Sequence, residues 1–363
     1  MDTDFEYKKY SRILKLNELR IKFTHDVELR IEIYKYLLRN SEREDKDEDT
    51  NTCGNLRVCR AIAKDPFYVG KVRELYDVTL DSSVLNKNDM VGMKISDRLS
   101  GFDRFLCNVP MKGLVLNSIS SWWFAKTNHF VPNHIVYDRF NYVTLVRKCK
   151  VFPIEFVVRG YMTGSTQTSI WQNYKKGMEH NGESDPVMFC GHSLRPGYKK
   201  NQKLDENILT PTTKSNIHDR PISKAEIIEE GIMSQKHWDK CEEYALALFE
   251  FGQKTCEERG LILVDTKYEF GLDNDGNVVI VDELHTPDSS RYWIAHNYNT
   301  NMQNGLEPDH IDKEFIRKWV KKTYNDPYKE GLEIVIPDDK IMTLSSRYLM
   351  LHEMITGKEL SIY

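Results

Sequence analysis

The residues with the clearest chemical potential lie in a predicted β-hairpin in the second half of the chain. Apolar and charged residues alternate over residues 262–270, and Asp275-Gly276 leads from them into a second apolar run. Asp-Gly between two such runs is typical of a two-residue hairpin turn. With this dipeptide as the turn, Glu269 lies directly opposite Asp282 on one face of the sheet.

Two carboxylates in such a position repel each other. The repulsion is relieved if one carboxyl group is protonated, if the register slips, or if a cation lies between the groups. Mg²⁺ fits the third arrangement, because one or two carboxylates commonly hold it while phosphate oxygens complete its shell. A structural sheet surface on which Lys267 neutralises both acids is an equally good interpretation. The hairpin pattern alone leaves this choice open.

A second group of motifs combines cations or hydroxyls with glycine or proline. Lys71 and Arg73 alternate along a predicted strand after Gly70, so both side chains are expected on one face, where phosphate oxygens could bind. The segment is not a Walker A loop, because Val72 stands where Ser or Thr is required. The other motifs of this kind lie at residues 96–103, 159–165, 210–214, 218–220 and 286–291.

The elements that must position these motifs are mostly strands. Runs rich in β-branched residues predict strands at residues 68–78, 90–96, 143–149 and 153–158. Helical spacing of apolar residues predicts helices at residues 118–128, 236–259 and 315–322. Turn-forming dipeptides predict a loop-rich stretch from residue 177 to residue 215.

Composition limits the class of protein. The chain has 363 residues and a formal net charge of −4, so no basic excess favours nucleic acid or a membrane as a partner. Its seven cysteines form no CxxC pair, which is typical of reduced thiols inside the cell. No apolar run approaches the roughly 18 residues of a membrane helix, and the acidic start is unlike a signal peptide. We therefore expect a cytoplasmic protein.

The first 64 residues differ from the rest. Residues 27–38 fit a strand or a helix equally well. Residues 41–49 carry six acids and two bases, which is typical of a solvated linker. The main body of the protein is expected to begin near Asp65.

In their order along the chain, the motifs resemble those of the SAICAR synthetase family, and the longer variant found in fungi is the closer match. The matching segments are residues 70–73, 96–100, 157–165, 210–214, 265–271 and 282–291. Residues 1–64, the tail after about residue 337 and the Gly101-Phe102 pair depart from the family pattern.

The resemblance implies an α+β fold with a small antiparallel-sheet lobe, a larger α/β lobe and an ATP cleft between them. Residues 1–64 would be an N-terminal extension and acidic linker. Residues 65–155 would form the small nucleotide-binding lobe. Residues 156–363 would form the larger substrate and ATP lobe with C-terminal helices.

The implied activity is an ATP-dependent ligation in purine biosynthesis. L-aspartate is joined to the carboxylate of carboxyaminoimidazole ribonucleotide (CAIR) through an acyl phosphate, giving SAICAR, ADP and phosphate. ATP and Mg²⁺ are the implied cofactors. The alternatives are a related ligase with another carboxylate and amine, a small-molecule kinase, and a nucleotide-binding regulator without turnover. The sequence leaves the oligomeric state open.

The resemblance also implies roles for individual residues. Glu269 and Asp282 would bind Mg²⁺, Lys71 and Arg73 would hold the ATP phosphates and assist catalysis, and Asp219 would accept a proton from the amine. The other implied ATP-binding residues are Lys150, Phe152, Glu155 and Lys267. The implied substrate-binding residues are Ser100, Asp103, Arg159, Ser165, Lys214, His218, Asp288 and Arg291.

Overall fold

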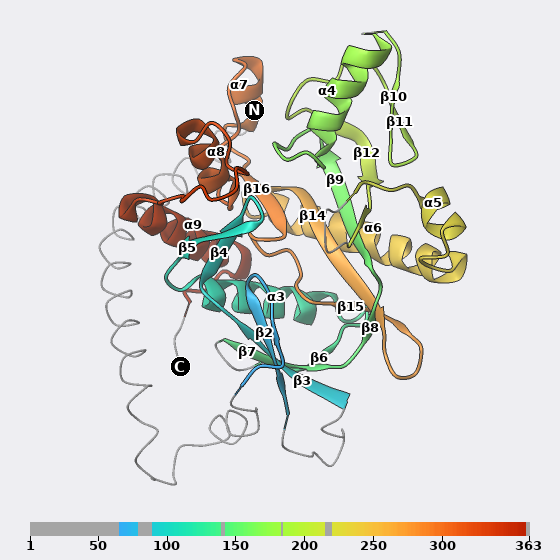
Figure 1. Cartoon of the computed structure of the whole chain (residues 1–363), viewed down its shortest axis with the longest axis vertical. Coiled ribbons are helices and arrows are strands. Elements are labelled where there is room, and N and C mark those ends of the chain that lie inside the picture. The colour runs from blue at the N-terminus through green and yellow to red at the C-terminus, as the bar shows by residue number, and fades with distance from the viewer. Residues whose placement is uncertain (1–64, 79–88, 139–141, 183, 215–219, 361–363) are drawn as a thin grey trace, which may run out of the picture.

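The computed structural model describes residues 65–78, 89–138, 142–182, 184–214 and 220–360. The predicted linker and the ambiguous segment at residues 27–38 lie outside the described residues. Two main antiparallel sheets organise the described chain, a smaller one at the bottom of Figure 1 and a larger one across its middle. Helices pack against both sheets, so the α+β class expected from the sequence is confirmed.

The smaller sheet has the strand order β1-β2-β3-β7-β6. Its strands are β1 (Tyr68–Val69), β2 (Arg73–Asp77), β3 (Met90–Ile95), β6 (Ile135–Tyr137) and β7 (Val143–Arg147). The strand expected at residues 68–78 is interrupted, because the Gly70 N–H donates to the Arg73 carbonyl at 2.7 Å and closes a turn. Lys71 lies in this turn, so its predicted place on one strand with Arg73 is wrong. A separate hairpin of β4 (Arg98–Gly101) and β5 (Arg104–Asn108) follows β3 in sequence.

The larger sheet has the order β12-β9-β14-β15, with β13 beside β9, and with β8 and β16 beside β14. Its strands are β8 (Lys150–Val151), β9 (Ile154–Tyr161), β12 (Lys203–Leu209), β13 (Thr212–Thr213), β14 (Leu261–Leu272), β15 (Val278–Val281) and β16 (Ser290–Ile294). The stretch expected as loops supplies β12 and β13, and also forms the hairpin of β10 (Val187–Phe189) and β11 (His192–Leu194). The predicted turns are present in this stretch, but the strands between them were not predicted, because they depend on partners that the local sequence does not show.

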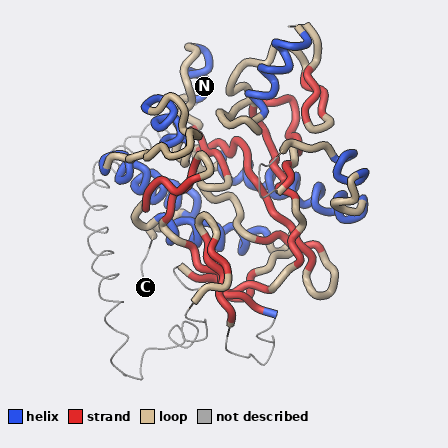
Figure 2. The backbone as a smooth tube through the Cα atoms, in the orientation of Figure 1, coloured by secondary structure: helices blue, strands red, loops and turns tan. Residues whose placement is uncertain are grey.

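The helices flank the sheets (Figure 2). They are α3 (Lys112–Thr127), α4 (Ile170–Asn181), α5 (Lys224–Glu229), α6 (Gln235–Glu257), α7 (Tyr298–Gln303), α8 (Glu314–Thr323) and α9 (Asp338–Thr356). The helix expected at residues 236–259 is α6, and its Trp238, Ala245 and Leu248 are buried. Helix α3 begins well before the expected residue 118, because it is buried on several sides and lacks an amphipathic pattern.

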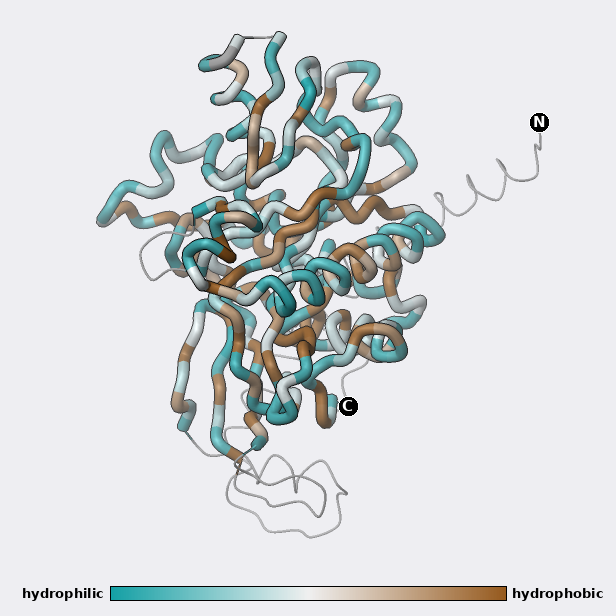
Figure 3. The backbone as a smooth tube through the Cα atoms, turned by 90° about the vertical axis from the view of Figure 1, so that its right-hand side faces the viewer, coloured by the Kyte–Doolittle hydropathy of each residue, from teal (hydrophilic) through white to brown (hydrophobic). Residues whose placement is uncertain are grey.

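One hydrophobic core joins most of these elements. Helix α3 packs between β3 and α9, and α6 packs on β9, β12 and β14. Apolar residues follow the strands through the middle of the molecule, whereas the outer helices and loops are largely polar (Figure 3).

The proposed lobe boundary at residue 155 falls inside β9, which belongs to the larger sheet, so the division into lobes stays a proposal. Within the described ranges, no helix is long and apolar enough to cross a membrane.

The hairpin of β14 and β15 has a different register from the predicted one. Glu269 pairs with Val281, not with Asp282. Strand β15 ends at Val281, and Asp282 adopts a left-handed conformation with φ of 68°, which removes it from the β alternation. The predicted cross-strand pair is therefore wrong, and the slipped register is the arrangement found.

The turn chemistry explains this slip. The Asp273 carboxylate accepts hydrogen bonds from the backbone N–H groups of Asp275 at 3.0 Å and Asn277 at 2.8 Å. Three residues therefore lie between Asp273 and Asn277, in place of the expected two. Gly276 takes the left-handed position with φ of 80°, as in a three-residue hairpin loop.

Candidate functional site

Strand β14 carries three charged residues at alternating positions, so all three lie on one face of the strand. Asp265 and Glu269 are buried, and Lys267 lies between them. Lys267 and Glu269 belong to one cluster of charged side chains, and Asp265 belongs to a second. Because one strand carries both clusters, β14 sets their relative positions.

The first cluster, called here the carboxylate cluster, forms where β2 meets the chain after β15. Arg73 begins β2, and its guanidinium lies 3.0 Å from the Asp282 carboxylate and 2.9 Å from that of Glu283. The Arg73 side chain is only 12% exposed, so this contact is largely shielded from water. The structure thus brings the predicted phosphate-binding Arg73 and the predicted metal ligand Asp282 together.

Lysines surround the other predicted metal ligand in this cluster. Lys267 Nζ lies 3.2 Å from the Glu269 carboxylate and 2.7 Å from that of Glu155. Lys214 Nζ donates to the second Glu269 oxygen at 2.5 Å. Lys214, expected at the substrate, therefore lies beside the predicted metal ligand, and both oxygens of Glu269 have a cationic partner.

The two predicted metal ligands differ in their electrostatics. Burial and the nearby carboxylates of Glu269 and Glu283 raise the pKa of Asp282 to about 6, against the opposing effect of Arg73. Burial also favours protonation of Glu269, but Lys267 and Lys214 overcome this and lower its pKa to about 2. The negative charge of Asp282 is thus unfavourable in the ligand-free fold, and a bound cation would stabilise it.

His134 contacts the backbone of Asp282, a role that no sequence motif predicted. The Asp282 N–H donates to His134 Nε2 at 3.2 Å, so this nitrogen carries no proton. Burial lowers the pKa of His134 to about 3, which keeps the imidazole neutral and able to accept this bond. His134 thereby supports the left-handed conformation of Asp282.

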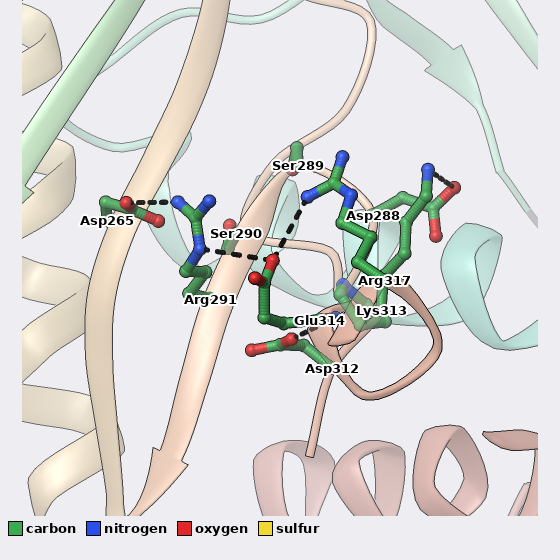
Figure 4. Close-up of a pocket in the computed structure, with 10 residues that line it drawn as sticks. Asp265, Asp288, Ser289, Ser290, Arg291, Asp312, Lys313, Glu314 and Arg317 are labelled. Carbon is green, nitrogen blue, oxygen red and sulfur yellow. Dashed lines mark hydrogen bonds and ion pairs between the residues drawn. The ribbon is translucent and has the colours of Figure 1, made fainter. Parts of the chain in front are cut away.

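The second cluster surrounds a small polar pocket (Figure 4). Asp265, Arg317 and residues 287–291 and 312–314 line it. Arg291 Nη1 donates to Asp265 at 2.6 Å, and Arg291 Nε lies 3.7 Å from the Glu314 carboxylate. Arg159 reaches the same Asp265 oxygen at 3.4 Å. The predicted substrate residues Arg159 and Arg291 are therefore joined through one buried acid.

Hydrogen-bond donors and cations surround the Glu314 carboxylate and stabilise its ionised form. The Ser165 hydroxyl donates to Glu314 at 2.6 Å, and Arg317 lies 3.6 Å from the same carboxylate. Burial opposes ionisation of Glu314, but Arg291 and Arg317 lower its pKa to about 2. Sequence reasoning missed Glu314 and Arg317. The available signal for Glu314 was the charged run at residues 312–314, before the predicted helix at residues 315–322 that contains Arg317.

Asp288 faces protein groups in this cluster. Its carboxylate lies 2.8 Å from Lys112 and 3.6 Å from Lys313, and it accepts a hydrogen bond from the Tyr348 hydroxyl at 2.8 Å. The Asp288 side chain is 5% exposed. The predicted contact of Asp288 with substrate stays a prediction. In the fold, its carboxylate binds the side chains of Lys112, Lys313 and Tyr348.

Other predicted residues lie outside both clusters. Lys71 is 68% exposed and pairs at 3.2 Å with Asp103 of the β4–β5 turn. Ser100 lies in β4, and Lys150 and Phe152 lie at the crossing into the larger sheet, where the Phe152 N–H donates to the Phe270 carbonyl. The remaining predicted residues, His218 and Asp219, lie outside the described residues.

The donor set of the carboxylate cluster suits Mg²⁺ held together with phosphates. Among the described residues, no group of three or more His, Cys, Asp or Glu side chains is arranged to hold a metal by itself. Glu269 and Asp282 offer two carboxylates, the number that Mg²⁺ takes when phosphate oxygens complete its shell. The buried Nε of Arg73 has no hydrogen-bond partner among the described residues, as expected of a group that awaits an anion.

Comparison with known proteins identifies the family. A family model described as SAICAR synthetase matches residues 66–334, about three quarters of the chain. The chain belongs to the SAICAR synthetase family. A phosphoribosylaminoimidazole-succinocarboxamide synthase from Legionella pneumophila is 49% identical over 291 residues, which cover 80% of this chain and 88% of that protein. The chloroplastic synthase of Arabidopsis thaliana is also 49% identical, over 81% of this chain and 67% of that protein.

Solved structures agree with this assignment to the SAICAR synthetase family. The SAICAR synthase of Saccharomyces cerevisiae, described as a complex with SAICAR, is 28% identical and matches with a TM-score of 0.66. The match covers 82% of this chain and 96% of the yeast chain. The family and the ligase class expected from the sequence motifs are confirmed.

Proposed function

We propose that this chain joins L-aspartate to the carboxylate of CAIR at the expense of ATP, giving SAICAR, ADP and phosphate. The observation that carries the proposal is the 49% identity to curated synthases over four fifths of the chain. The yeast relative, described as a complex with SAICAR, supports the same product class. The two charged clusters on β14 match the two halves of this reaction.

The carboxylate cluster would serve phosphoryl transfer from ATP. A carboxylate oxygen of CAIR attacks the γ-phosphorus, and the bond to the β,γ-bridging oxygen breaks, so ADP leaves and an acyl phosphate forms. Arg73, Lys71 and Lys267 would offset charge on the phosphates, which is the main way in which proteins accelerate this chemistry. Mg²⁺, held by Glu269 and Asp282, would neutralise further phosphate charge.

The polar pocket would hold the ribonucleotide. Arg159, Ser165 and Arg291 would bind its phosphate group, since guanidinium and hydroxyl donors suit phosphate oxygens. The aspartate nitrogen then attacks the acyl carbon, and the carbon–oxygen bond to phosphate breaks. The amine proton would pass to Asp219, which stays a prediction.

We place the reaction in the cytoplasm with small molecules as partners. The cysteines of the described residues carry no disulfide, as expected in a reducing compartment. These cysteines are Cys107, Cys149, Cys190, Cys241 and Cys256. One plant relative is named as chloroplastic, so relatives differ in location.

The test is ADP release measured with each substrate omitted in turn. The proposed ligase needs ATP, CAIR and L-aspartate together, and forms SAICAR in equal amount to ADP. A kinase would release ADP without aspartate, and a ligase for another pair would need different substrates. No ADP release with the complete mixture would contradict the proposal and favour a regulator.

Lys71→Met should weaken the use of ATP without weakening the fold. Among the described residues, the Lys71 side chain pairs only with the exposed Asp103, and exposed ion pairs contribute at most about 1 kcal/mol. We expect kcat/KM for ATP to fall roughly 10- to 100-fold through loss of one charge-assisted contact, with the melting temperature unchanged. Asp103→Asn, which breaks the same pair, is the control and should keep its KM for ATP. An equal effect of both variants would show that the ion pair, not a phosphate contact, matters.

A further inference from the structure

Helix α9, which lies beyond the matched family region, contacts a residue that lines the polar pocket. The family match ends at residue 334, and α9 begins at Asp338. The helix packs against α3 and α8. Its Tyr348 is fully buried, and the Tyr348 hydroxyl donates to Asp288 Oδ1 at 2.8 Å. A residue outside the recognised motifs thus contacts a residue inside one of them.

Asp288 connects three helices. Lys112 begins α3, Lys313 directly precedes α8, and Tyr348 lies in the middle of α9. Lys112 is completely buried, and its ion pair with Asp288 measures 2.8 Å. A buried charge that loses one of its partners is costly, so these contacts hold the Asp288 carboxylate in one place.

The turn that carries Asp288 also places Arg291. The Ser290 N–H donates to the Thr286 carbonyl at 2.9 Å and closes this turn. The Ser290 hydroxyl is 2.7 Å from that of Thr266 on β14. Arg291 follows at once, and its side chain lies between Asp265 and Glu314 in Figure 4. Asp288 and Arg291 thus lie three residues apart, on the turn and on the start of β16 that follows it directly.

We infer that Tyr348 is a positioning residue for the ribonucleotide, which acts through Asp288 on the 286–291 turn and so on Arg291. The inference rests on the proposed function, because that proposal assigns Arg291 to the ribonucleotide phosphate. The Tyr348 ring packs in the core, and its hydroxyl is the atom that links α9 to the turn. Helix α9 is thereby part of the substrate site.

Tyr348→Phe tests the inference, because it removes the hydroxyl and keeps the ring. We expect the KM for CAIR to rise roughly 3- to 10-fold, the loss of one hydrogen bond, while the KM for ATP stays unchanged. Ser345→Ala is the matched control on the same helix. Ser345 is equally buried, and its hydroxyl donates at 2.8 Å to the Pro110 carbonyl, away from Asp288. This control should lower the melting temperature slightly and leave both KM values unchanged.

A double variant gives a second readout. If Tyr348 acts through Asp288, adding Tyr348→Phe to Asp288→Asn should raise the KM for CAIR by less than twofold beyond the single Asp288→Asn variant. Equal melting losses in Tyr348→Phe and Ser345→Ala with both KM values unchanged would overturn the inference, and so would an equal rise of both KM values in Tyr348→Phe. Turnover of the wild type distinguishes a failure of the proposed function from a failure of the Tyr348 inference. An inactive wild type would contradict the proposed function, whereas an active wild type allows the role of Tyr348 to be tested.

Discussion

Asp282→Asn should lower turnover roughly 10²- to 10³-fold, the usual effect of removing one group that stabilises developing charge. The amide keeps the size of the carboxylate but removes its charge from the proposed metal site. The ligand-free fold should tolerate the change, because Arg73 keeps its ion pair with Glu283. Burial raises the pKa of Asp282 to about 6, so the ionised group is less favourable in the folded than in the unfolded chain.

Thermal melts and steady-state kinetics check this result together. The wild type should gain melting temperature with Mg²⁺ and ATP, and Asp282→Asn should gain much less. Glu283→Gln is the matched control, since Glu283 also pairs with Arg73 but is not a proposed ligand. It should keep most of the ligand-induced gain. If Glu283→Gln loses turnover as strongly as Asp282→Asn, the shared contact with Arg73 is the important feature and the metal assignment is wrong.

Arg291→Lys should raise the KM for CAIR roughly 10- to 100-fold with little change in the KM for ATP. Lysine keeps the charge but loses the planar fork that can bind phosphate and Asp265 together. A contact between charged groups contributes about 1.5–3 kcal/mol, which corresponds to this range. Arg291 lies in the polar pocket and not in the carboxylate cluster, so the effect should be confined to the ribonucleotide.

Arg195→Lys is the control for this substitution. Arg195 also makes a two-point contact with a carboxylate, that of Asp205 at 2.8 and 3.2 Å, but it lines a different cavity. Steady-state kinetics with each substrate varied should show normal KM values for this control. An equal rise in the KM for ATP in Arg291→Lys would place the side chain on the ATP side of the site.

The sequence determined those features of the site that depend on local rules. The period of two along β14 placed Asp265, Lys267 and Glu269 on one face, and the structure has them there. Helical spacing of buried residues located α6. The order of short motifs identified the family, because those motifs hold the charged residues of both clusters.

The register of the hairpin needed more than the local pattern. Asp275-Gly276 predicts a two-residue turn, but the Asp273 side chain binds the backbone of the loop and stabilises a longer one. A shift of one residue in the register changes which residues of the two strands are paired and on which face of the sheet their side chains meet. Asp282 consequently meets Arg73 from the smaller sheet, and not Glu269 across the hairpin.

Tertiary structure alone decided which distant charges are buried together. Lysine is rarely buried, so nothing near Lys112 in the sequence predicts its complete burial against Asp288. Glu314 in the lining of the polar pocket, and Tyr348 in contact with Asp288 of that lining, likewise come from helices that are remote in sequence from β14. Local patterns fix the face on which a side chain lies. The partner of a buried charge can lie on an element that is distant in sequence. Only the packing of these elements in three dimensions determines which partner it is.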